Sequence, residues 1–177
     1  GCDATRFTEL RALEPYYHAR PWSAALAGKR VLVVHPFRRT ILAQYEKRTQ
    51  LFPGKDVLPE LASLTVIQAV QGLGGQDTGY ADWFDALTEM ERRMDAADYD
   101  VAIVGAGAYS LPLAAHARDT GHAAIQMSGA TQLLFGIKGK RWDDHPVISK
   151  LYNPAWVRPD ETEGISNKEK VEGGSYW

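Results

Sequence analysis

Two short runs of apolar, mostly β-branched residues constrain the fold more than any other feature of the sequence. They are Val31–Val34 and Val101–Val104. Neither run alternates between apolar and polar residues, as a strand with one face in water does. Each therefore predicts a strand buried on both faces, the kind found in parallel sheets that helices cover on both sides.

Segments with helical spacing separate these runs from other strand-like segments. Residues 40–52, 80–97 and 111–120 have apolar side chains at helical intervals, and residues 64–70 and 123–127 have strand character. Strands that alternate with helices at this rhythm predict parallel βαβ units with right-handed crossovers. We therefore expect an α/β fold, a Rossmann-like three-layer domain with a mostly parallel sheet and an irregular C-terminal wrap.

The length of 177 residues and the hydrophobic content of 45% fit a single domain with a proper core. We expect a lead-in over residues 1–28, a βαβ core over 29–135 and a wrap over 136–177. The wrap has too many aromatic residues for a disordered tail, so it is predicted to be ordered and to cross the functional edge of the sheet. Its aromatic residues would also suit a partner surface, which leaves an oligomer open.

Charge and composition bear on several classes of protein. The formal net charge is -2, and nothing resembles the concentrated basic face of nucleic-acid binders. No apolar run approaches the roughly 18 residues that a membrane-spanning helix needs, and no signal-peptide pattern is present. The only cysteine is Cys2, so no internal disulfide can form and a cytoplasmic setting is expected.

The first candidate binding loop follows the second apolar run. Its glycines let a ligand approach bare backbone amides, and the helix start behind them attracts anions. The residues predicted to meet a nucleotide or its phosphates are Gly105, Gly107, Tyr109 and Ser110. NAD is not expected, because Ser110 stands at the third glycine position of the dinucleotide pattern and no acidic residue ends the next strand. The alternative is a tight turn that binds nothing.

The second candidate loop follows the strand predicted over 123–127. Gly129, Thr131 and Gln132 would contact a sugar or a second phosphate there. Alternatively, Thr131 or Ser128 only caps the short helix that follows. Two such loops side by side form a crevice, which is the usual ligand position in open α/β sheets.

The third candidate is a basic cluster. Lys138, Lys140 and Arg141 could neutralise a diphosphate, or they form a solvated turn. Asp143 and Asp144 follow, and their oxygens are of the kind that hold a divalent metal.

The fourth candidate is His35, at the end of the first apolar run. The ordinary pKa of histidine suits proton transfer near neutrality, so His35 is the one catalytic base we nominate. The alternative is a histidine that caps its strand by hydrogen bonding. The sequence contains no zinc-ligand spacing, nucleophile elbow or Walker loop.

The segments 33–37, 101–114, 129–136 and 139–142 together resemble a family of uncharacterised bacterial proteins whose genes accompany surface-polysaccharide synthesis. The block 101–136 is also similar to the C-terminal half of GT-D type glycosyltransferases. That resemblance implies a Rossmann-like fold, a nucleotide-sugar donor and a divalent metal held by an Asp-x-Glu motif in the N-terminal half. This sequence has no counterpart there, since Asp160–Glu163 lies in the late wrap.

Three hypotheses follow. The first is a glycosyltransferase-type domain that binds a nucleotide-sugar donor for polysaccharide synthesis, or the donor-binding part of such an enzyme. The second is a non-catalytic module that binds a nucleotide or a glycan, as a fragment of a larger protein. The third is a structural domain whose glycines serve packing alone.

Overall fold

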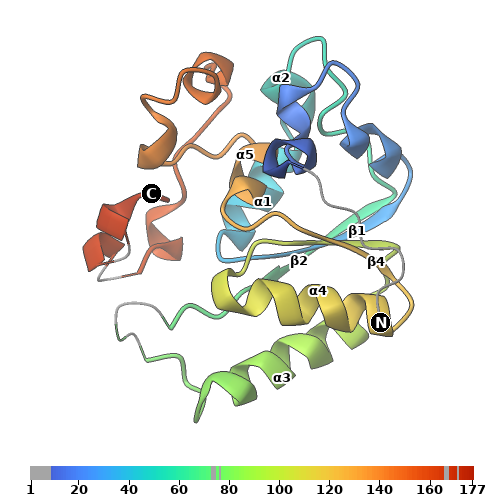
Figure 1. Ribbon diagram of the computed structural model, residues 1–177, viewed down its shortest axis with the longest axis vertical. Coiled ribbons are helices and arrows are strands. Elements are labelled where there is room, and N and C mark those ends of the chain that lie inside the picture. Colours follow the sequence, from blue (N-terminus) through green and yellow to red (C-terminus); the bar gives the residue numbers. More distant parts are fainter. Residues whose placement is uncertain (1–8, 73–74, 76, 166–167, 171) are drawn as a thin grey trace.

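A four-stranded sheet forms the centre of the computed structural model, which describes residues 9–72, 75, 77–165, 168–170 and 172–177. All neighbouring strands are parallel. Their order across the sheet is β2 (Ser63–Gln68), β1 (Arg30–His35), β3 (Val101–Val104) and β4 (Ala123–Gln126). The predicted α/β fold with a parallel sheet is confirmed (Figure 1).

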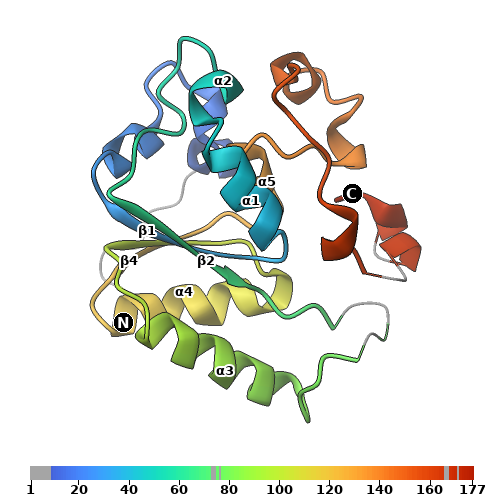
Figure 2. The same cartoon turned by 180° about the vertical axis from the view of Figure 1, so that it is seen from behind.

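Helices cover both faces of this sheet. The elements α1 (Arg38–Tyr45), α2 (Arg48–Leu51) and α5 (Ala130–Leu134) lie on one face. The elements α3 (Trp83–Asp95) and α4 (Ser110–Asp119) lie on the other, as the two opposite views show (Figures 1 and 2). The chain leaves β1 in one direction across the sheet and returns past it to β3, so the strand order reverses between β1 and β3. In open α/β sheets such a switch point is where ligands bind.

The central strand β1 is buried on both faces, which explains why residues 31–34 are all apolar. Val31 and Val33 face the core beneath α1 and α5, whereas Leu32 and Val34 face the core beneath α3 and α4. All four side chains are at most 1% exposed. Alternate residues of a strand point to opposite faces, so burial of both faces requires an apolar residue at every position.

The predicted helices form, but one of them is divided in two. The segment 40–52 divides into α1 and α2, because the backbone at Lys47 leaves the helical region. In α3 the buried stripe is Ala86, Met90 and Met94, and Asp82 caps the helix by accepting the Asp85 N–H at 2.9 Å.

Trp83 and Phe84, two apolar residues of the segment 80–97, lie at the start of α3 but not on its buried face. They are 37% and 70% exposed. Trp83 instead stacks on Tyr109, so the first turn of α3 lies at the edge of the sheet and not over its core.

The C-terminal wrap, residues 136–177, consists mostly of short 3₁₀ turns. Its anchor is Trp156, which is 3% exposed and donates its indole N–H to the Leu51 carbonyl at 2.9 Å. Ile137 pairs with Val157 in a parallel bridge, and Asn153 donates to the carbonyls of Gln50 and Leu51. The described part of the wrap therefore packs on the α1–α2 side. Its 3₁₀ turns are Lys140–Trp142, Ile148–Leu151, Glu161–Glu163, Lys168–Lys170 and Glu172–Gly174.

The lead-in is also built from 3₁₀ turns, at Leu10–Leu13, Pro15–Tyr17 and Trp22–Leu26. Tyr16 is 1% exposed, and its ring stacks on Phe52 with the ring centroids 6.4 Å apart. The lead-in thus contributes to the core on the same face as the wrap.

An ion pair at the amino ends of β1 and β3 gives a testable pH dependence. The Arg30 guanidinium donates to both oxygens of Asp100, which also accepts the Arg30 backbone N–H at 2.8 Å. These hydrogen bonds lower the pKa of Asp100 to about 2. Because an unfolded aspartate has a pKa of about 3.9, the stabilisation is present above pH 4 and is lost as the pH falls towards 2.

We expect Asp100→Asn to be less stable than wild type at pH 7 and to lose less further stability between pH 4 and pH 2. Urea unfolding at a series of pH values measures this. Asp144→Asn, at an exposed position outside any described ion pair, is the control and should keep the wild-type pH profile. An unchanged profile in Asp100→Asn would contradict the assignment.

Candidate functional site at the carboxyl edge of the sheet

The ends of β1, β3 and β4 meet at the switch point, and Gly105 lies where they converge. A Cβ atom at Gly105 would lie 2.6 Å from the Ser128 carbonyl oxygen, 2.6 Å from Thr131 Oγ1 and 2.8 Å from His35 Cδ2. Real Cβ atoms do not approach other atoms so closely, so only glycine fits here. The structure thus brings together His35, Gly105 and Thr131, and it gives Gly105 a packing role.

In the loop after β3, only Gly107 is open among the residues selected from the sequence. It is exposed, has a φ of +57°, and would have no atom within 4 Å of a Cβ. Ser110 is buried and its Oγ accepts the Ala106 N–H at 2.7 Å, so it fixes the turn. Tyr109 is 8% exposed and stacks on Trp83 with centroids 5.0 Å apart and planes 6° apart.

The loop after β4 is covered by the tail, residues 172–177. The Tyr176 ring lies where a side chain on Gly129 would be. Gln132 is 1% exposed and donates to the carbonyls of Lys138 at 3.2 Å and Tyr176 at 3.1 Å. Contact of Gly129 or Gln132 with a ligand would require the tail to move, so it stays a prediction.

Thr131 differs from its neighbours because it is fully buried and its hydroxyl has no hydrogen-bond partner among the described residues. A buried hydroxyl without a partner costs about 1–3 kcal/mol. The Thr131 hydroxyl thus has unused hydrogen-bonding capacity inside the switch point.

The basic cluster does not converge on one point. Lys138 Nζ lies 5.2 Å from the centre of the Tyr152 ring. Arg141 packs over Tyr176 at 5.0 Å and lies 3.4 Å from the Glu172 carboxylate. Lys140 is exposed and its ammonium makes no hydrogen bond or ion pair with the described residues. The cluster therefore fixes the tail and leaves one free cation in the part of the chain that the structure describes.

His35 is a strand cap. It is 3% exposed, and its Nδ1 accepts the Phe37 N–H at 3.1 Å, which requires the neutral ring with its proton on Nε2. Burial lowers the pKa of His35 to about 3. The prediction that its pKa suits proton transfer near neutrality is wrong, because the sequence does not show how deeply the ring is buried.

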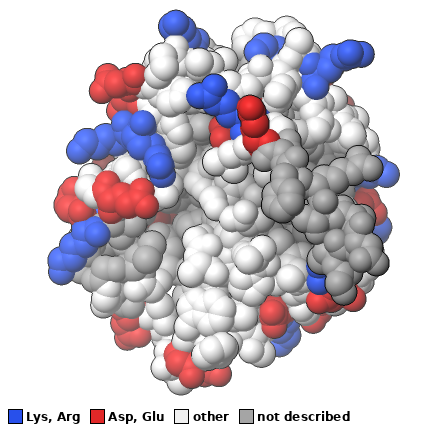
Figure 3. All heavy atoms as spheres, in the orientation of Figure 1, with Lys and Arg blue, Asp and Glu red and all other residues white. Residues whose placement is uncertain are grey.

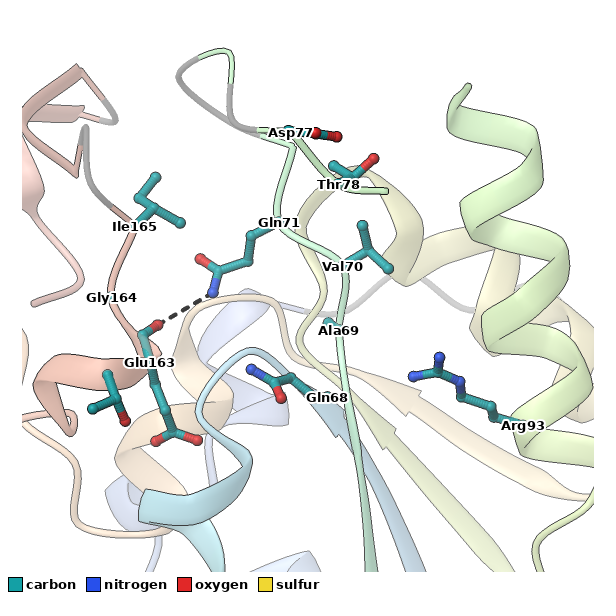
Figure 4. A pocket seen from close by; sticks show the side chains of 11 residues that line it. Gln68, Ala69, Val70, Gln71, Asp77, Thr78, Arg93, Glu163, Gly164 and Ile165 are labelled. Atoms are coloured by element: carbon teal, nitrogen blue, oxygen red, sulfur yellow. Dashed lines mark hydrogen bonds between the residues drawn. The ribbon is translucent and has the colours of Figure 1, made fainter. Parts of the chain in front are cut away.

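A pocket of about 300 Å³ at the carboxyl end of β2 was not selected from the sequence. We call it the β2 pocket (Figure 4). Its lining is mostly polar: Gln68, Ala69, Val70, Gln71, Asp77, Thr78, Arg93, Thr162, Glu163, Gly164 and Ile165. The sequence signal that could have indicated it is the pair Gln68 and Gln71, two polar residues at the end of β2 and just after it.

Glu163 closes one side of this pocket and joins the wrap to α1. It is 3% exposed, and its carboxylate accepts the Arg39 N–H, the Thr40 N–H at 3.0 Å and the Thr40 hydroxyl at 2.6 Å. A negative charge is stabilising at a helix N-terminus. The helix start after β1 is therefore filled by a carboxylate of the protein itself. In Figure 4 the Gln71 amide reaches the Glu163 carbonyl, at 3.3 Å.

Charges of both signs surround the face seen in Figure 3 and do not form a field of one sign there. Within the described residues, no three His, Cys, Asp or Glu side chains lie together so that they could hold a metal ion. Asp143, one of the two predicted metal ligands, pairs with Arg158 at 2.7 Å. None of the described helices has the length and apolar content needed to cross a membrane.

Comparison of the chain with protein-family models, curated proteins and solved structures found no match.

His35 should stay neutral through the physiological pH range. We expect its ring proton signals in an NMR titration to stay constant from pH 8 to pH 4.5. Unfolded histidine has a pKa of about 6.5, so the unfolded state binds more protons below that pH and stability should fall from pH 6.5 towards 3. A midpoint near 6.5 for His35 would show that the ring is accessible.

Gly105→Ala should destabilise the fold by about 1–3 kcal/mol, since the added methyl has no room between three strand ends. Gly107→Asn is the matched control, because its side chain enters open space and asparagine tolerates a positive φ, so its cost should stay below about 1 kcal/mol. Urea unfolding of both variants measures the difference, and equal stability of the two would contradict the packing role of Gly105.

Proposed function

We propose that this chain binds a nucleotide-sugar at the carboxyl edge of its sheet, as the donor-binding domain of a glycosyltransferase-type protein for polysaccharide synthesis. The observation that carries the proposal is the polar β2 pocket, which lies one strand away from the switch point. The resemblance of the sequence to glycosyltransferases gives the proposal its chemical class.

The β2 pocket suits the sugar. The amides of Gln68 and Gln71 and the hydroxyl of Thr78 both donate and accept hydrogen bonds, as sugar hydroxyls do. The side chain of Gln68 makes no hydrogen bond with any described residue, so it is free for a ligand. The volume of about 300 Å³ is at the lower end of small-molecule pockets.

The nucleotide would lie across the N-terminal ends of α3 and α4. Phe84 packs edge-on against Trp83 with ring centroids 5.1 Å apart, and Trp83 stacks on Tyr109. A base that stacks on an aromatic side chain gains about 1–3 kcal/mol. The open turn at Gly107 lets a phosphate approach the backbone closely.

A second candidate function is a binding module without catalysis. The neutral, buried His35 favours it, because that side chain cannot take up a proton near neutrality. Turnover of a donor by this chain alone would exclude this candidate.

The proposal is tested by thermal-shift and calorimetric titration of the chain with a panel of nucleotide-sugars and the matching free nucleotides, with and without Mg²⁺ or Mn²⁺. A ligand at a hundred times its Kd stabilises the native state by about 2.7 kcal/mol. We expect one nucleotide-sugar to bind, and binding of none of them would overturn the proposal.

Two variants then separate the two halves of the ligand. Gln68→Leu should weaken the nucleotide-sugar about tenfold, the loss of about one hydrogen bond, and leave the free nucleotide unchanged. Phe84→Ala should weaken both ligands. Gln50→Leu, an equal change at an exposed position on α2, is the control. Equal effects of Gln68→Leu and Gln50→Leu would rule out the β2 pocket as the sugar site.

A further inference from the structure

A second pocket, of about 370 Å³, lies between α1 and the wrap segment 157–160. We call it the α1 pocket. It shares no lining residue with the β2 pocket. The two pockets are adjacent, because Glu163 of the β2 pocket accepts the N–H of Thr40, which lines the α1 pocket. Its lining is Arg39, Thr40, Ala43, Gln44, Lys47, Val157, Arg158 and Asp160.

We propose that the α1 pocket is a separate binding site for a small molecule with two oxyanion groups of the phosphate class. Three cations and one carboxylate line it. The inference rests on this pocket alone and does not depend on the proposed nucleotide-sugar function.

The helix α1 and the residues just after it set the spacing of two cations. Arg39 and Ala43 lie one turn apart on the same side of α1, and Lys47 follows two residues after the helix ends, where the backbone is no longer helical. The small side chain of Ala43 leaves room between the two long basic side chains. An elongated ligand with a negative group towards each end fits this arrangement better than a single compact anion.

Arg158 supplies the third cation from the opposite wall. Its Nη2 donates to both oxygens of Asp143, at 2.8 and 2.7 Å, which holds the guanidinium in place. Its Nε and Nη1 groups make no hydrogen bond with the described residues, so they can donate to an oxyanion. Arginine held in this way is well suited to phosphate oxygens.

The remaining polar groups are already occupied. Gln44, at the base of the pocket, is 1% exposed and donates to the carbonyls of Gly136 and Ala155. The Asp160 carboxylate accepts from the N–H and the hydroxyl of Thr162, at 2.8 and 2.6 Å. Arg39 is also engaged, because its Nη1 donates to the Thr162 hydroxyl at 3.0 Å and its Nη2 lies 3.9 Å from the Asp160 carboxylate. Lys47 has no ion-pair partner among the described residues, so it is the cation with the most to gain from an anion.

The experiment uses inorganic pyrophosphate as the probe, followed by calorimetry and by NMR chemical shifts at low ionic strength. Lys47→Ala should weaken pyrophosphate binding at least tenfold, the loss of one charge-assisted contact. Lys29→Ala removes the same charge at the amino edge of the sheet, where Lys29 is exposed, and should leave the affinity unchanged.

Ala43→Leu gives a test without any change of charge. The position is exposed on α1 and leucine is a good helix former, so the fold should persist. The larger side chain occupies the space between Arg39 and Lys47 and should abolish binding. Urea unfolding of each variant verifies that the fold is intact.

Equal affinities of Lys47→Ala and Lys29→Ala would overturn the site, since the attraction would then be general electrostatics. Normal pyrophosphate binding by Ala43→Leu would also overturn it. Loss of pyrophosphate binding in Gln68→Leu would overturn it in favour of the β2 pocket. Nucleotide-sugar binding is measured in parallel and should be unaffected in Lys47→Ala, so failure of this proposal and failure of the proposed function are distinguishable.

Discussion

Burial of both faces of β1 is the constraint on which the rest of the structure depends. Its side chains at Val31 and Val33 belong to one core and those at Leu32 and Val34 to the other, so no position between Arg30 and His35 can be polar. Two layers of helices must then cover the sheet. The chain therefore crosses one face after β1 and the opposite face after β2, and the reversal creates the switch point.

The second organising contact is the carboxylate of Glu163 at the start of α1. It accepts two backbone N–H groups that would otherwise lack partners at the helix start, and it also accepts the Thr40 hydroxyl. The same contact fixes the wrap against the sheet edge and leaves a pocket on either side, the β2 pocket and the α1 pocket. In many folds of this class the helix start after the first strand attracts an anionic ligand. Here the Glu163 carboxylate occupies that position, and the polar groups that remain free line the β2 pocket and the α1 pocket.

The arrangement has consequences for chemistry as well as for binding. His35 is neutral and committed to the Phe37 amide, so proton transfer at the switch point near neutrality cannot rely on its uptake of a proton. The free groups at the edge are amides, hydroxyls, aromatic faces and the Lys140 ammonium. Such groups recognise and orient a polar ligand, which is why the proposed role is donor binding.

The sequence alone determined the strands, the parallel sheet and the edge at which the candidate loops meet, because these follow from the side-chain period of neighbouring residues. It did not determine which polar groups at that edge are free. Gln132 is committed to the tail, Ser110 to its own turn and His35 to the next loop. Glu163 reaches Thr40 across 123 residues of chain. Burial and hydrogen-bond partners of this kind depend on segments far apart in sequence, so only the tertiary structure decided them, and with them the position of both pockets.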